Sequence, residues 1–233
     1  MSISHRVFGL RLAAAAGVAV FVSACGDKPA AKPADNSLAK LTEPGDPRFN
    51  ATAPDSFDVD VVTTKGEMTV RVHRDWSPRG VDRFYGLVSN HYFDDVAFHR
   101  AIKGFVAQFG IHGDTVVNHA WEGKNIMDDP VKTSNKAGTL SFARAGVNSR
   151  STQMFFNLAD NQPLDTLSVG GFPPIGHVIK GIEVLTQINT EYSTGAPGPD
   201  QGQLAHQGNA YLRANFPRID YIKTARIATT WKK

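Results

Sequence analysis

The sequence predicts an all-β domain, built as a closed sheet or a sandwich and carrying few helices. Short apolar runs recur along the chain between Gly, Asn, Asp and Pro residues, and few stretches have a helical period. Hydrophobic residues make up 41% of the 233 residues and charged residues 20%. That is an ordinary globular composition, which excludes a disordered chain and a disulfide-built one.

The first expected elements form a hairpin followed by a helix. Every second residue is apolar in 57–61 and again in 68–72, on either side of the turn Lys65-Gly66. Ser77-Pro78 is typical of a helix start, and apolar residues follow at helical spacing from Val81 to Val88. Further strands are expected over 105–109, 139–143, 154–158, 175–179 and 219–227, with a second helix over 182–188.

Residues 1–24 are typical of an export signal. Arg6 and Arg11 precede an uncharged apolar run, Leu12 to Val22, which is shorter than the roughly 18 to 20 residues of a spanning helix. The run Val22-Ser23-Ala24-Cys25 resembles a bacterial lipobox, which implies a lipidated Cys25 facing the periplasm. Gly26 after this cysteine favours the outer membrane. The alternative is an ordinary cleavage site and a soluble periplasmic protein.

Residues 25–56 are expected to be a flexible tether behind the anchor. The part from Gly26 to Ser56 has five prolines, many alanines and one aromatic residue, Phe49. Such a stretch buries too little apolar area to offset chain entropy. One domain is therefore expected over 57–229, with a short tail at 230–233.

Charge and cysteine content exclude two classes of function. The formal net charge of +3 falls to +1 when the two arginines of the signal are removed (3 − 2 = 1), so a nucleic-acid binder is not expected. The single cysteine excludes an internal disulfide and a thiolate metal site.

Two separated motifs carry the functional signal. The run 98–110 contains Phe-His-Arg, four residues, Phe, two residues and Gln; the second motif comprises 138–145 and 151–156. In this order they resemble the cyclophilin family of peptidyl-prolyl cis-trans isomerases, and the likeness extends from about Phe57 to Ile227. The resemblance implies a closed eight-stranded antiparallel β-barrel with two flanking helices.

The resemblance also implies a site. Arg100 is the catalytic residue, and the substrate-binding residues are Phe105, Val106, Gln108, Ala143, Arg144, Gln153, Phe155, Leu164 and Phe172. Arg144 stands where asparagine is usual, so its backbone would serve the groove while its side chain adds charge beside it. Pro163 replaces the usual tryptophan, so tight binding of cyclosporin is not expected.

The reaction itself explains this choice of residues. Rotation about an X-Pro bond crosses a barrier of about 18–20 kcal/mol because it breaks amide resonance, yet no covalent bond is made or broken. The catalyst therefore needs no nucleophile, metal or cofactor; it must favour the twisted amide. A permanently charged guanidinium can donate to the prolyl nitrogen, which regains its lone pair in that state.

Other polar residues have simpler interpretations. His99 is expected to be a packed structural histidine, since no proton is abstracted. His112, Asp114 and His119 match no metal-ligand spacing, and the serines of 148–151 lack a nucleophile elbow.

The sequence therefore predicts a monomeric isomerase that acts on proline-containing segments of unfolded or flexible envelope proteins. A non-catalytic chaperone that binds proline peptides is the alternative. A scaffold lipoprotein with an idle groove is a third reading, which the intact Arg, Phe and Gln set disfavours.

Overall fold

The computed structural model describes residues 40–167, 170–193 and 198–231. The strands are β1 (Ser56–Thr63), β2 (Glu67–His73), β3 (Val96–Ala97), β4 (Arg100–Ala101), β5 (Val106–Phe109), β6 (Thr139–Phe142), β7 (Met154–Asn157), β8 (Pro174–Lys180) and β9 (Tyr221–Trp231). The helices are α2 (Pro78–Ser89), α3 (Thr115–Trp121), α4 (Glu183–Gln187) and α5 (Gln201–Asn215), with 3₁₀ turns η1 (Pro47–Phe49), η2 (Gln162–Asp165) and η3 (Glu191–Ser193).

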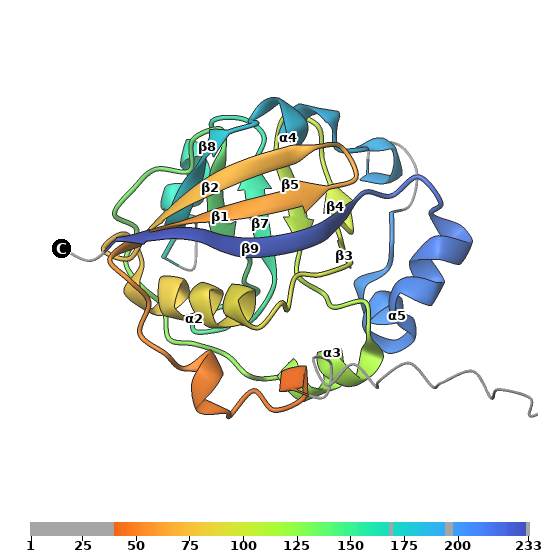
Figure 1. The fold of residues 1–233 in the computed structure, drawn as a ribbon. Helices are drawn as coiled ribbons and strands as arrows, with labels where there is room; N and C mark the ends of the chain where they lie inside the picture. Colours follow the sequence, from red (N-terminus) through yellow and green to blue (C-terminus); the bar gives the residue numbers. More distant parts are fainter. Residues whose placement is uncertain (1–39, 168–169, 194–197, 232–233) are drawn as a thin grey trace, which may run out of the picture. The chain divides into compact units, whose positions relative to one another are not determined.

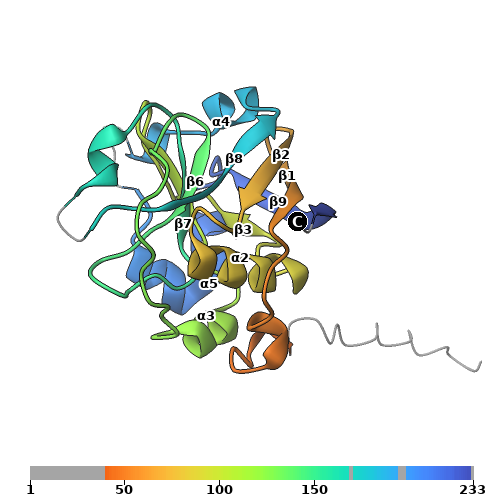
Figure 2. The same cartoon turned by 90° about the vertical axis from the view of Figure 1, so that its left-hand side faces the viewer.

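The strands form one curled antiparallel sheet in the order β3-β9-β1-β2-β8-β6-β7-β5-β4, which Figures 1 and 2 show from two sides. The prediction of a mostly β, cyclophilin-like fold is confirmed, but the closed eight-stranded barrel is not: the sheet is a nine-stranded half-barrel. The edge strands β3 and β4 follow each other after only two residues, Phe98 and His99. Both edges of the sheet therefore belong to one short segment, 96–101, in which β3 pairs with β9 and β4 pairs with β5 but no ladder pairs β3 with β4.

The hairpin and the first helix form as the sequence predicts. Phe57 pairs with Val72 and Val61 with Met68, and the alternating residues of both strands are buried. In α2, Pro78 occupies the first turn and Val81 and Phe84 enter the core. Helices α2 and α4 lie at opposite ends of the curled sheet in Figures 1 and 2.

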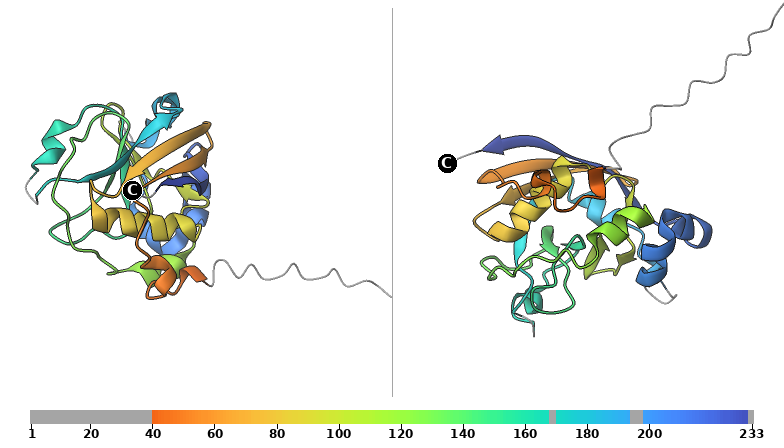
Figure 3. Two further views of the ribbon diagram at one scale, coloured as in Figure 1. Left: turned by 60° about the vertical axis from the view of Figure 1, so that its left-hand side comes forward. Right: turned by 90° about the horizontal axis from the view of Figure 1, so that it is seen from below.

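The sequence predicts two flanking helices, but the described residues contain more than two, because α3 and α5 flank the sheet as well. Figure 3 shows them side by side from below. Leu204 and Leu212 of α5 pack with Ile111 and Ile219 in a second buried cluster. Gly208 interrupts α5 with φ 63°, and a side chain there would collide with the Gly113 carbonyl.

The core lies on the concave side of the sheet. Phe109 contacts Phe93, Phe98 and Phe156 at ring-centroid distances of 5.5, 5.6 and 5.5 Å. These inward residues alternate along β5 and β7 with residues that face outward. The outward set therefore lies on the convex face of the same strands.

The residues 40–56, expected to belong to an extended tether, are packed in the structure. Leu41 and Phe49 are 3% and 2% exposed. Trp121 Nε1 donates to the Leu41 carbonyl at 2.8 Å, and its ring meets Phe49 edge-on at 5.0 Å. The indole supplies a donor and an apolar wall that composition alone does not reveal. The rest of the predicted tether, the export signal and Cys25 lie outside the described residues.

Within those described ranges, no helix is long and apolar enough to cross a membrane.

Candidate active site

The polar half of the site comes from strand alternation. Arg100 of β4 pairs with Gln108 of β5, and Gln108 pairs with Phe155 of β7. Because side chains on one face repeat every second residue, Val106 and Gln108 share the outer face with Gln153 and Phe155. The register therefore gathers predicted residues of both sequence motifs on one surface.

A chain of hydrogen bonds links three of these side chains. Arg100 Nη1 donates to Gln108 Oε1 at 3.2 Å, and Gln108 Nε2 donates to Gln153 Oε1 at 2.9 Å. The Arg100 guanidinium also lies 5.9 Å from the centre of the Phe105 ring. These contacts orient the guanidinium on a half-buried surface before any substrate arrives.

The apolar half lies beside it. Val106, Phe155 and Leu164 form a small buried cluster of their own, outside the main core, and Phe105, Ala143 and Phe172 pack against it. Phe172 meets Phe155 edge-on at a centroid distance of 5.8 Å. The structure thus places all the apolar members of the predicted substrate-binding set in one cluster.

Backbone and amide contacts hold the part of the apolar cluster that lies outside the sheet. Turn η2 presents Leu164, whose carbonyl accepts from Phe172 N at 2.9 Å. Asn135 Nδ2 donates to Asp165 Oδ1 at 2.8 Å and to the Phe172 carbonyl at 2.9 Å. Buried Asn135 and half-buried Asp165 are not singled out by the sequence, because they lie 30 residues apart along the chain.

Arg144 departs from the expectation that its charge lies beside the groove. Its side chain is 1% exposed and its Nη1 lies 2.6 Å from Asp128 Oδ2. Burial lowers the pKa of this guanidinium, and the Asp128 carboxylate partly offsets that effect. The sequence does not reveal this pair, because Asp128 lies outside both motifs.

His99 is buried, as expected for a structural residue. Burial, with a smaller contribution from the charge of Arg100, lowers its pKa to about 3. The imidazole is therefore neutral at ordinary pH.

The remaining polar candidates are involved in local structure. His112 Nδ1 accepts from Asp114 N at 2.9 Å, Asp114 caps α3, and His119 is exposed. Ser149 Oγ closes the turn that follows Ala145. In the part of the chain that the structure describes, no three His, Cys, Asp or Glu side chains are grouped to hold a metal ion.

A cavity of about 790 Å³ adjoins the polar chain. Gln108, Ala143 and Gln153 form one wall, and Trp121, Ala205 and His206 of α3 and α5 line the other side. The sequence did not point to this second wall, because neither helix was predicted.

Comparison with known proteins identifies the family. The family model described as cyclophilin type peptidyl-prolyl cis-trans isomerase/CLD matches residues 58–205, and the chain belongs to this family. The peptidyl-prolyl cis-trans isomerase cypE of Dictyostelium discoideum is 32% identical over 134 residues, covering 56% of this chain and 83% of that protein. The peptidyl-prolyl cis-trans isomerase A of Dickeya dadantii is 32% identical over 152 residues, covering 62% and 78%.

Solved structures show the same fold. A cyclophilin type peptidyl-prolyl cis-trans isomerase of Cryptosporidium parvum superposes with a TM-score of 0.55 at 22% identity, covering 76% of this chain and 99% of that one. A second crystal structure of that protein was determined in the presence of the dipeptide Ala-Pro. The predicted class of enzyme, a peptidyl-prolyl cis-trans isomerase, is confirmed by the family and by the names of these relatives.

Proposed function

We propose that this chain accelerates cis-trans rotation of X-Pro bonds with Arg100 as the catalytic residue. The prolyl ring enters the cluster of Val106, Phe155 and Leu164, and the Arg100 guanidinium donates to the prolyl nitrogen of the twisted amide. The observation that carries this proposal is the position of a hydrogen-bonded guanidinium next to an apolar cluster on one convex surface. The Ala-Pro dipeptide used with the Cryptosporidium relative supports a proline-containing substrate.

The two halves of the site both contribute to lowering the barrier to rotation. A charge-assisted hydrogen bond contributes about 1.5–3 kcal/mol, or roughly one to two decades of rate at 1.36 kcal/mol per decade. The rest comes from binding that favours the twisted amide: the cluster grips the ring, and Gln108 holds a neighbouring carbonyl. No proton moves, in keeping with the neutral His99.

Two-dimensional NMR exchange spectroscopy on an Ala-Pro peptide tests the activity. The purified chain should increase the cis-trans exchange rate in proportion to its concentration. Peptide chemical shifts that move on binding while exchange stays at the spontaneous rate would instead support the non-catalytic chaperone.

The proposal extends to the cell envelope. Lipidation of Cys25 holds a monomeric domain on the periplasmic side of a bacterial membrane, with the outer membrane favoured, and its substrates there are unfolded or flexible exported proteins. The support is the order of charged start, apolar run and Val22-Ser23-Ala24-Cys25 in the sequence. Two or more acyl chains are needed for stable anchoring.

Mass spectrometry of the mature protein tests the anchor. An acylated Cys25 should be the first residue. An unmodified N-terminus at another position would make the protein a soluble periplasmic one.

A further inference from the structure

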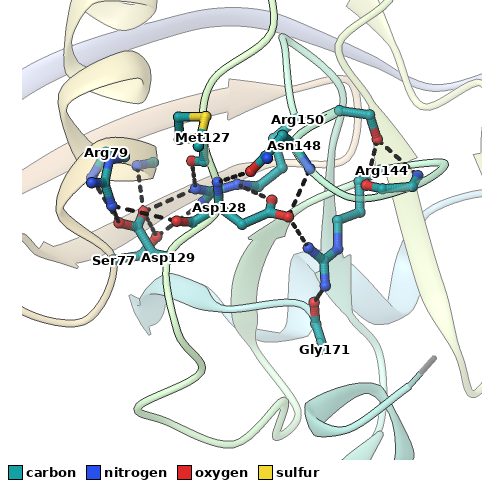
Figure 4. A network of polar contacts seen from close by, with 12 residues as sticks. Ser77, Arg79, Met127, Asp128, Asp129, Arg144, Asn148, Arg150 and Gly171 are labelled. Carbon is teal, nitrogen blue, oxygen red and sulfur yellow. Dashed lines mark hydrogen bonds and ion pairs between the residues drawn. The ribbon is translucent and has the colours of Figure 1, made fainter. Parts of the chain in front are cut away.

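Arg144 lies where the end of β6 meets the loop that carries Phe172. Its Nη1 pairs with Asp128 at 2.6 Å, and its Nη2 donates to the Gly171 carbonyl, as Figure 4 shows. The guanidinium carbon also lies 5.4 Å from the centre of the Phe172 ring. One side chain therefore contacts a carboxylate, the backbone before Phe172 and the face of the ring itself.

Asp128 is itself held firmly. Its backbone N–H and carboxylate exchange hydrogen bonds with Asn148, at 2.8 and 2.7 Å, and its Oδ1 lies 3.3 Å from Arg150 Nε. The Arg150 side chain is 0% exposed and also pairs with Asp129 at 3.0 Å. This position of Asp128 is therefore fixed independently of the groove.

The network ends in α2. Asp129 accepts from Ser77 Oγ at 2.7 Å and from Gly80 N at 3.0 Å, at the start of that helix. Figure 4 shows the contacts running from Arg79 and Ser77 through Asp129, Arg150 and Asp128 to Arg144 and Gly171. Helix α2 is thereby connected to Phe172, which packs against the apolar cluster.

Besides Arg144, Phe172 packs against the apolar cluster. Its backbone is held by Leu164 and Asn135, but its ring is only partly buried and rests edge-on against Phe155 at 5.8 Å. The Arg144 guanidinium provides a flat surface for that ring. Arginine offers separate nitrogen donors together with a planar face, whereas a lysine ammonium is a single point charge.

We infer that Arg144 is a positioning residue of the isomerase site: it holds Phe172 against Phe155 and thereby sets the affinity for the prolyl ring. The inference rests on the proposed function. The two arginines then have different roles: Arg100 stabilises the twisted amide, and Arg144 strengthens binding of the prolyl ring through Phe172. Arg144 itself touches no reacting atom.

The test compares Arg144→Ala and Arg144→Lys with Arg218→Ala in the full chain. Arg218 forms an exposed ion pair with Glu191 and serves as a matched control. Both Arg144 variants should weaken Ala-Pro peptide binding about three- to tenfold, the range expected for loss of an ordered aromatic contact. The rate of exchange in the bound peptide should change less than twofold. If lysine at this position fails to restore peptide affinity, the role of Arg144 is to position the Phe172 ring and not to neutralise a charge.

Two further measurements exclude a merely structural role. The Phe172 ring resonances of the free protein should shift in both Arg144 variants and not in the control. In a double-mutant cycle, Arg144→Ala should add little to the loss of affinity caused by Phe172→Ala.

The outcomes separate this inference from the proposed function. Unchanged peptide affinity in the Arg144 variants, or additive losses in the cycle, overturns the inference. A wild-type chain that binds the peptide without accelerating exchange overturns the function alone, and one that binds no peptide overturns both.

Discussion

Arg100 and Gln108 face each other across the β4–β5 ladder, and Arg100 Nη1 donates to Gln108 Oε1 at 3.2 Å. Gln153 extends this contact from β7 through a bond of 2.9 Å to Gln108. The donor is thus aimed before substrate binds, and a preorganised donor avoids reorganisation during the reaction.

Arg100→Ala should lower kcat/KM for Ala-Pro exchange about ten- to a hundredfold, because one charge-assisted hydrogen bond to the twisted amide is lost. Exposed Lys103, three residues away, is the matched control for loss of a nearby positive charge. Lys103→Ala should retain the wild-type rate. Equal rates for Arg100→Ala and wild type, with both folded by circular dichroism, would reject the assigned mechanism.

Arg150→Ala should reduce the free energy of unfolding by about 3–5 kcal/mol, because it removes the buried cation that pairs with Asp129 and leaves that carboxylate only the exposed Arg79, at 3.4 Å. Hydrogen bonds from Ser77, Gly80 and Arg150 lower the pKa of Asp129 despite its burial, so the carboxylate stays ionised. Urea unfolding measures the loss. Arg218→Ala, at an exposed pair, should cost no more than about 1 kcal/mol, and a similar loss in both variants would contradict the role of the network.

Protonation of His99 should destabilise the fold in acid. Its pKa falls from an ordinary 6.5 to about 3 in the folded state, so the unfolded chain binds more protons between these values. Stability is complete above pH 6.5 and falls as the pH drops through this window, by up to about 1.4 kcal/mol per pH unit.

His99→Gln should remove this contribution to the pH dependence of the free energy of unfolding, measured from pH 8 to pH 4. At pH 8 the imidazole is neutral in both states, so the difference between variant and wild type there reports packing alone. An unchanged slope below pH 6.5 would show that His99 takes up no proton on unfolding.

Phe49→Ala should destabilise the domain by about 3–5 kcal/mol, although Phe49 lies in the Pro/Ala-rich segment, because it creates a cavity against Trp121. Thermal unfolding and the near-ultraviolet circular dichroism of tryptophan measure the effect. Val116→Ala, exposed on α3, is the matched control. If Phe49→Ala matched this control, the packing of residues 40–56 would contribute nothing to stability.

Local patterns account for the elements that the sequence predicted well. The alternation in 57–61 and 68–72 depends only on near neighbours, and it appears as the β1–β2 hairpin. The helix after Ser77-Pro78 is likewise a local feature. Helix α5 was missed because its weak amphipathic pattern is interrupted at Gly208, where the backbone leaves the helical region.

The sequence by itself determined the β-rich class and the family resemblance, because motif spacing and strand alternation are properties of short stretches; the site residues that the resemblance implies remain a prediction. Tertiary structure decided that Arg144 turns away from solvent toward Asp128 and that Leu41 meets Trp121, 80 residues further along. It also decided that α3 and α5 complete the cavity beside Gln153. Such contacts depend on the path of the whole chain, since a buried charge or indole takes whichever partner the fold places within hydrogen-bonding distance.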